Sequence, residues 1–194
     1  ATQFCKSLTK KGYLVFAQMM VTINYSDEEI LEAVNDFNKI NLESLYIVDS
    51  FGVMKENDLT RIFYLIDNNL KTDISIGYHS HNNLQLAFSN AQRFIEISKK
   101  RNIIIDSTVF GIGRGAGNLN TELIIKYLND LQDFRYEPYP ILQIIDEVLN
   151  NFYTKNSWGY SLPHYLSANN NCHPNYATYL SDKKTLTIES ISEI

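Results

Sequence analysis

Apolar and polar positions along this chain follow two patterns that alternate up to about residue 133. Short apolar runs predict strands, and each is followed by a segment with apolar residues three or four apart, which predicts an amphipathic helix. Phe4 and Leu8 indicate the end of an earlier helix, and Ser26 precedes a helix as its N-cap. The other predicted elements are strands at residues 13–23, 44–48, 74–78 and 102–107 and helices at residues 56–70, 84–99 and 118–131.

Four successive strand and helix units predict an α/β fold with parallel strands joined by right-handed crossovers. An eight-unit TIM barrel needs about 250 residues, so these units correspond to half of such a barrel. The chain begins with Ala inside a predicted helix, and we therefore expect it to hold the C-terminal half of a TIM barrel without the N-terminal half. A complete four-strand sheet of the doubly wound type is the alternative.

Residues 134–194 have a different character, with four prolines, one predicted helix at residues 141–153 and a loop at residues 169–171. We expect a helical C-terminal extension here, following a partial-barrel catalytic domain at residues 1–133. An open half-barrel exposes unpaired strand edges and an apolar interior, so the sequence also predicts aggregation or self-association, for example as a homo-oligomer.

Charge, cysteine content and apolar run length limit which partners and which cellular compartment we expect. The net charge is -5 and no run of Lys or Arg occurs, which argues against nucleic acid or an anionic membrane as a partner. Cys5 and Cys172 are far apart and in no metal-binding spacing, which is typical of a reduced, cytoplasmic protein. No apolar run approaches the roughly 18 residues of a membrane span.

The first chemical signal is a pair of histidines at the end of a predicted strand, in the run from Gly77 to Leu84. His79 and His81 are two residues apart, so on an extended backbone both imidazoles point to the same side and are able to bind one divalent cation. A structural or solvent-exposed pair is the alternative. His164, Cys172 and His173 are too few for a zinc site, and we expect structural roles for them.

Two further motifs follow predicted strands. Residues 106–118 contain alternating glycines before a helix, which permits close approach to a ligand and offers N–H groups to an anion. Gly111, Gly113 and Ala116 also fit a relaxed dinucleotide-binding pattern, but on the last strand rather than the first. Asp49 opens an Asp-Ser-Phe-Gly turn, where it is either a site residue or a helix cap.

The three motifs together, in this order, resemble those of the HMGL-like metal-dependent aldolases and lyases, the DRE-TIM metallolyases. The resemblance covers about residues 12–132 and is strongest to the 4-hydroxy-2-oxovalerate aldolase branch. It rests on residues 48–54, 81–86 and 111–118. Gln85 departs from the small residue of many members, and residues 134–194 lack most of the branch's pattern.

The resemblance implies a Mn²⁺ or Mg²⁺ ion at the carboxyl end of the barrel. The family also supplies an Asp ligand from a first strand that has no counterpart in these residues. Asn118 is either a ligand or a helix cap, Arg114 either a substrate contact or a solvated charge, and Tyr160 either catalytic or a packing residue. The implied metal ligands are His79, His81 and Asn118, the implied catalytic residues Arg114 and Tyr160, and the implied supports or loop anchors Asp49 and Asp106.

The resemblance further implies a metal-dependent aldolase or lyase that acts on a small 2-oxo acid such as pyruvate. A condensing enzyme that uses an acyl-CoA, like 2-isopropylmalate or citramalate synthase, would use the same enolate chemistry. A non-catalytic scaffold derived from a barrel is the third hypothesis. In the bacterial aldolases the C-terminal domain binds an aldehyde dehydrogenase, which is therefore a further candidate partner.

Overall fold

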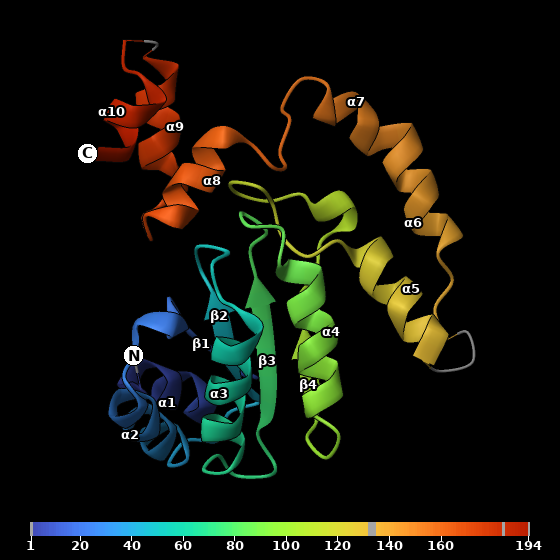
Figure 1. Ribbon diagram of the computed structural model, residues 1–194. Helices are drawn as coiled ribbons and strands as arrows, with labels where there is room; N and C mark the ends of the chain where they lie inside the picture. Colours follow the sequence, from blue (N-terminus) through green and yellow to red (C-terminus); the bar gives the residue numbers. More distant parts are fainter. Residues whose placement is uncertain (1, 132–134, 184, 194) are drawn as a thin grey trace. The chain divides into compact units, whose positions relative to one another are not determined.

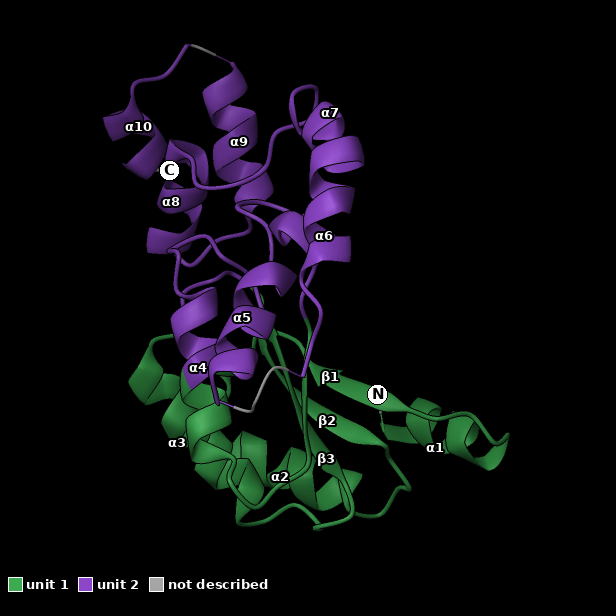
Figure 2. Cartoon of the chain, turned by 90° about the vertical axis from the view of Figure 1, so that its right-hand side faces the viewer, with its two compact units in different colours: residues 1–50, 54–79, 93–106 green, residues 51–53, 80–92, 107–194 purple. Residues whose placement is uncertain are grey.

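The computed structural model describes residues 2–131, 135–183 and 185–193, and the chain divides into two compact units (Figure 2). Unit 1, shown in green, comprises residues 1–50, 54–79 and 93–106. Unit 2, shown in purple, comprises residues 51–53, 80–92 and 107–194. The predicted boundary between residues 133 and 134 lies outside the described residues.

The chain forms a four-stranded sheet whose strands are neighbours in sequence order (Figure 1). β1 pairs in parallel with β2, and β3 pairs in parallel with β4, as expected for strands joined by helical crossovers. The strands are β1 (Phe16–Met19), β2 (Ser44–Asp49), β3 (Ser75–Ser80) and β4 (Ile103–Ile105). The predicted α/β fold of alternating strands and helices is confirmed.

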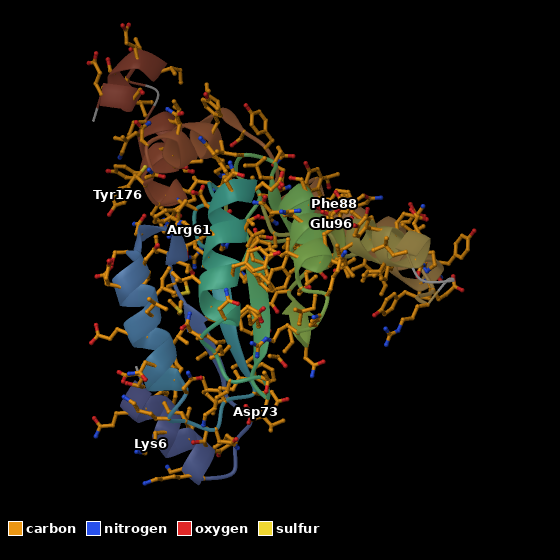
Figure 3. All side chains as sticks on the ribbon, turned by 60° about the horizontal axis from the view of Figure 1, so that its bottom comes forward. Lys6, Arg61, Asp73, Phe88, Glu96 and Tyr176 are labelled. Atoms are coloured by element: carbon orange, nitrogen blue, oxygen red, sulfur yellow. The ribbon has the colours of Figure 1, made fainter. Side chains whose placement is uncertain are left out.

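Helices precede β1 and follow each strand. They are α1 (Thr2–Lys10), α2 (Asp27–Phe37), α3 (Glu56–Asp67), α4 (Ala87–Ile97) and α5 (Thr121–Leu131). The predicted N-cap is confirmed as a capping box, because Ser26 Oγ accepts from Glu29 N–H (3.2 Å) while Glu29 Oε2 accepts from Ser26 N–H (2.8 Å). Arg61, labelled on α3 in Figure 3, pairs with Asp27 and so connects α3 to the start of α2.

Aromatic residues form the packing between the sheet and its helices in unit 1. Tyr78 of β3 stacks on Phe94 of α4 with ring centroids 5.3 Å apart, and Phe94 meets the edge of Phe63 of α3 at 5.5 Å. All three side chains are at most 1% exposed. Because side chains alternate along a strand, Gly77 and His79 lie on the opposite face of β3 from Tyr78.

The predicted strand at residues 13–23 is too long, since β1 contains only Phe16–Met19. Thr22 ends it by two side-chain bonds, in which its Oγ1 donates to Met19 O (2.5 Å) and accepts from Val48 N–H (2.8 Å). Val21 adopts a left-handed conformation with φ 54°, and a 3₁₀ turn follows at Thr22–Asn24. A local side-chain bond has therefore replaced the end of the strand.

The described part of unit 2 beyond residue 134 consists of short helices joined by turns and loops. It contains α6 (Tyr139–Ile144), a π-helix (Ile145–Leu149), α7 (Asn150–Tyr153), α8 (Leu162–Asn169), α9 (Pro174–Asp182) and α10 (Ile188–Glu193). The predicted helix at residues 141–153 is thus present but includes a π-helical stretch. Within residues 2–131, 135–183 and 185–193, no helix has the length and apolar character that crossing a membrane requires.

Candidate functional site

His79 lies near the end of β3, on the face opposite the helices of unit 1. Its Nδ1 is 3.0 Å from Oδ2 of Asp106, which directly follows β4. The backbone N–H of Asp106 donates to Tyr78 O (3.0 Å), so the β3–β4 pairing brings the acid beside the histidine. A carboxylate that accepts from Nδ1–H holds an imidazole in the tautomer whose Nε2 is the metal-binding nitrogen.

The other oxygen of Asp106 is paired with a tyrosine that the sequence did not single out. Tyr46 of β2 donates its hydroxyl to Asp106 Oδ1 (3.1 Å). Burial of the phenol, together with the charge of Asp106, raises the pKa of Tyr46 to about 12. In the structure the Tyr46 ring lies against Gly77, where a Cβ would come within 2.4 to 2.5 Å of three ring atoms.

In unit 2, His81 lies beside Asn118 of the loop at residues 111–118, called here the glycine loop. The two residues form an isolated antiparallel bridge, and Asn82 N–H donates to Gly117 O (2.9 Å). Asn118 Nδ2 donates to Ile112 O (3.3 Å), whereas its Oδ1 is buried and has no hydrogen-bond partner among the described residues. A buried amide oxygen without a partner is costly, and a bound cation would satisfy it.

Asn118 does not cap α5. The helix begins at Thr121, three residues later than predicted, because the intervening residues pair with other backbone. Thr108 N–H donates to Leu119 O, and Thr121 N–H donates to Thr108 O, both at 2.9 Å. Gly117 is required in this loop, since its φ is 88° and a Cβ would lie 2.1 Å from Gly111 O.

One buried amide joins the loops of unit 2. Asn83 is 1% exposed, its Oδ1 accepts from Ala116 N–H (2.8 Å), and its Nδ2 donates to Phe51 O (3.0 Å). Gly52 lies so close that a Cβ there would be 2.6 Å from Asn83 N. The residues after His81, the glycine loop and the Phe51–Gly52 part of the aspartate turn therefore meet at Asn83.

Asp49 has a different local environment from Asp106. It is buried at 1% exposure, and its Oδ2 accepts from Met54 N–H (3.1 Å). The carboxylate thus accepts from the backbone within the turn between β2 and α3, and its role beside a metal ligand stays a prediction.

The two residues predicted to be catalytic both lie in unit 2. Arg114 is exposed, with its Nη1 3.3 Å from His173 Nε2. Tyr160 is 61% exposed and lines a cavity of about 200 Å³ together with Phe110 and Trp158. Neither residue has a described hydrogen bond to His81 or Asn118.

The remaining histidines have local partners. His164 Nδ1 lies 3.1 Å from Gly159 O, and His173 Nδ1 accepts from Asn175 N–H at the start of α9. Across the described ranges, no group of three or more His, Cys, Asp or Glu side chains is arranged to hold a metal ion.

Comparison with known proteins gives the family. The profile of the HMGL-like family matches residues 1–147. The 4-hydroxy-2-oxovalerate aldolase of Shewanella halifaxensis is 32% identical over 121 residues, which is 62% of this chain and 33% of the relative. The chain thus spans about a third of the length of this curated relative.

Solved structures give the same fold. The N-terminal domain of a candidate aldolase from Bacteroides vulgatus superposes with a TM-score of 0.82 at 27% identity, over 99% of this chain and 61% of that one. The HMG-CoA lyase of Brucella melitensis superposes with a TM-score of 0.57 at 13% identity, over 67% of this chain and 49% of that one. The predicted family and the predicted partial TIM barrel are both confirmed.

Proposed function

The chain belongs to the HMGL-like family, and from this we propose that it forms part of a divalent-metal-dependent aldolase or lyase that makes or breaks a C–C bond next to a 2-oxo acid. The family contains aldolases and lyases, and the curated relatives are named for the substrate 4-hydroxy-2-oxovalerate. Their names support a 2-oxo acid of pyruvate type as the substrate class.

The buried oxygen of Asn118 carries the proposal. Asn118 Oδ1 has no partner among the described residues, although Nδ2 of the same amide is used. His81 is its bridge partner, and His79 is two residues away along the chain. Side chains two apart on an extended backbone project to the same side, so we assign His79, His81 and Asn118 to one cation.

The ligand types favour Mn²⁺ over Mg²⁺, because Mg²⁺ is bound almost entirely by oxygen whereas two imidazoles stand here. A cation held there would supply Lewis-acid stabilisation of the negative charge that develops on the 2-oxo group when the bond between its α and β carbons breaks. Arg114 is the candidate partner for the substrate carboxylate, which a guanidinium binds through two parallel hydrogen bonds. Tyr160 is the candidate hydroxyl donor or acceptor.

Enolisation tests the proposal without knowledge of the second substrate. We expect Mn²⁺ to promote exchange of the pyruvate methyl protons with deuterium, observed by NMR, in the protein that contains this chain. The variant His79→Ala/His81→Ala should lose this exchange down to the rate of free Mn²⁺. The matched control is His164→Ala, which removes a histidine whose Nδ1 lies beside Gly159 O and should retain exchange.

Two outcomes would contradict the proposal. Equal exchange in His79→Ala/His81→Ala and in the control variant would show that the histidine pair is not the metal site. Bound Mn²⁺ without any exchange would exclude pyruvate enolisation and favour acyl-CoA condensation or a scaffold. Partnership with an aldehyde dehydrogenase and the oligomeric state stay predictions, which co-purification and sedimentation would test.

A further inference from the structure

We propose that Tyr46 is a positioning residue for the metal-binding imidazole of His79, acting through Asp106. The inference rests on the proposed function, because it assigns a purpose to the orientation of a metal ligand. Tyr46 does not touch the substrate or the cation in this proposal. Its task is to hold the carboxylate that in turn holds the imidazole.

A continuous chain of hydrogen bonds supports this role within unit 1. The Tyr46 hydroxyl lies 3.1 Å from Asp106 Oδ1, and Asp106 Oδ2 lies 3.0 Å from His79 Nδ1. Both carboxylate oxygens are therefore engaged, which opposes rotation of the carboxylate about its bond to Cβ. The acid needs this restraint, because its side chain is 34% exposed and water would otherwise compete for Oδ1.

The sheet itself fixes the tyrosine ring. Tyr46 is 4% exposed and lies in the middle of β2, in register with Gln18 of β1. On its other side the ring lies against Gly77 of β3, where a Cβ would come within 2.4 to 2.5 Å of three ring atoms. The absence of a side chain at Gly77 thus makes room for the ring, two residues before His79 in the same strand.

The protonation state of Tyr46 sets which groups donate in the hydrogen bonds that join Tyr46, Asp106 and His79. A phenol with a pKa of about 12 stays protonated at neutral pH and donates to Asp106. The carboxylate then accepts from His79, which places the imidazole proton on Nδ1. In that tautomer Nε2 carries the lone pair that binds a cation. The Tyr46 hydroxyl thus favours the metal-binding tautomer of His79 in the metal-free protein.

The first test reads the tautomer in the metal-free protein by two-dimensional NMR of ¹⁵N-labelled histidine. We expect His79 to carry its proton on Nδ1 in the wild type and to populate both tautomers in Tyr46→Phe, which keeps the ring and removes only the hydroxyl. Tyr64→Phe is the matched control, because Tyr64 lies on α3 with 45% exposure and should leave His79 unchanged. If the Tyr46 hydroxyl had only a structural role, its removal would leave the NMR signals of the His79 tautomer unchanged.

The second test measures Mn²⁺ affinity by electron paramagnetic resonance. We expect Tyr46→Phe to bind Mn²⁺ about tenfold more weakly, at the lower end of the range for residues that orient metal ligands. Gly77→Ala should weaken binding in the same direction, because it displaces the ring and keeps the hydroxyl. Thermal melts of each variant establish that the protein is folded during the measurement.

The two tests separate this inference from the proposed function. An unchanged Nδ1–H tautomer of His79 in Tyr46→Phe would overturn the inference, and so would a wild type that carries the proton on Nε2. If the wild type binds no Mn²⁺ but Tyr46→Phe still mixes the tautomers, the proposed function fails while the positioning by Tyr46 stands. Loss of the tautomer preference together with weaker Mn²⁺ binding supports both.

Discussion

The sheet of unit 1 and the segment from α6 to α7 contain similar apolar residues but bury them to opposite extents. In β2, Leu45, Ile47 and Val48 are fully buried. In the second segment, Val148 is 57% exposed and Phe152 is 48% exposed, and none of the described residues of α6, the π-helix or α7 is buried. Apolar content alone therefore does not indicate a core, because a residue contributes to stability only through the area it removes from water.

The short C-terminal helices are an intermediate case. Leu166, Ala177 and Ile191 form a small buried cluster, with Leu180 packed against it. Around them large side chains stay exposed, such as Tyr176, labelled in Figure 3, at 67% and Tyr179 at 61%. The difference between the regions predicts where substitutions are costly and where they are tolerated.

The largest expected effect is in the aromatic core of unit 1. Phe94→Ala removes the ring that contacts both Tyr78 and Phe63, and we expect it to lower the free energy of unfolding by about 3–5 kcal/mol. Urea denaturation followed by circular dichroism measures this change. Val148→Ala is the control and should stay within about 0.5 kcal/mol. Equal losses for both variants would mean that the segment from α6 to α7 is covered in solution, and the comparison would fail.

An intermediate effect is expected where the loops of unit 2 meet. Asn83→Ala leaves Ala116 N–H and Phe51 O without their partner, at a cost of about 1–3 kcal/mol for each unsatisfied group. Asn151→Ala is the control, because the exposed side-chain amide of Asn151 in α7 donates to Glu147 O of the preceding π-helical turn and joins no loops. Hydrogen exchange of the amide of Ala116 reports the loop directly, and unchanged protection in Asn83→Ala would show that the loop is held by other contacts.

The smallest effect compares two helix caps. Ser26→Ala removes the side-chain half of the capping box of α2, and we expect a loss of about 1 kcal/mol. Ser161 occupies the same position before α8 but makes no side-chain cap bond, so Ser161→Ala should change stability by only a few tenths of a kcal/mol. Thermal melts of the two variants would refute the comparison if Ser161→Ala were the more destabilising substitution.

The parts of the fold that sequence could predict are those governed by periodicity. The four strand and helix units follow from apolar patterns, and Ser26 follows from the chemistry of helix ends. The errors occur where a side chain bonds to distant backbone. Thr22 ends β1 because its hydroxyl accepts from Val48 N–H. Helix α4 begins at Ala87 rather than at residue 84, because Gln85 has a left-handed backbone conformation and Asn82 Oδ1 accepts from Ala87 N–H (3.2 Å).

The candidate site divides in the same way. The histidine pair and the glycine loop are visible in sequence because they are local motifs. The role of Tyr46 is not visible in sequence, since a tyrosine within an apolar strand resembles an ordinary core residue. Only the fold brings its partner Asp106, sixty positions later, beside it. Asn83 lies within the motif at residues 81–86, but its role depends on contacts with two other loops, which the sequence alone does not show.

The meeting of three loops at Asn83 has a consequence for how this protein can diverge. A change in the glycine loop moves the Ala116 N–H that donates to the Asn83 amide, and a change after β2 moves the Phe51 carbonyl that accepts from it. We therefore expect that neither loop can be exchanged alone. Loop grafts from relatives should therefore succeed only as a matched set. We expect the three loops to change together during evolution, although they are far apart in the sequence.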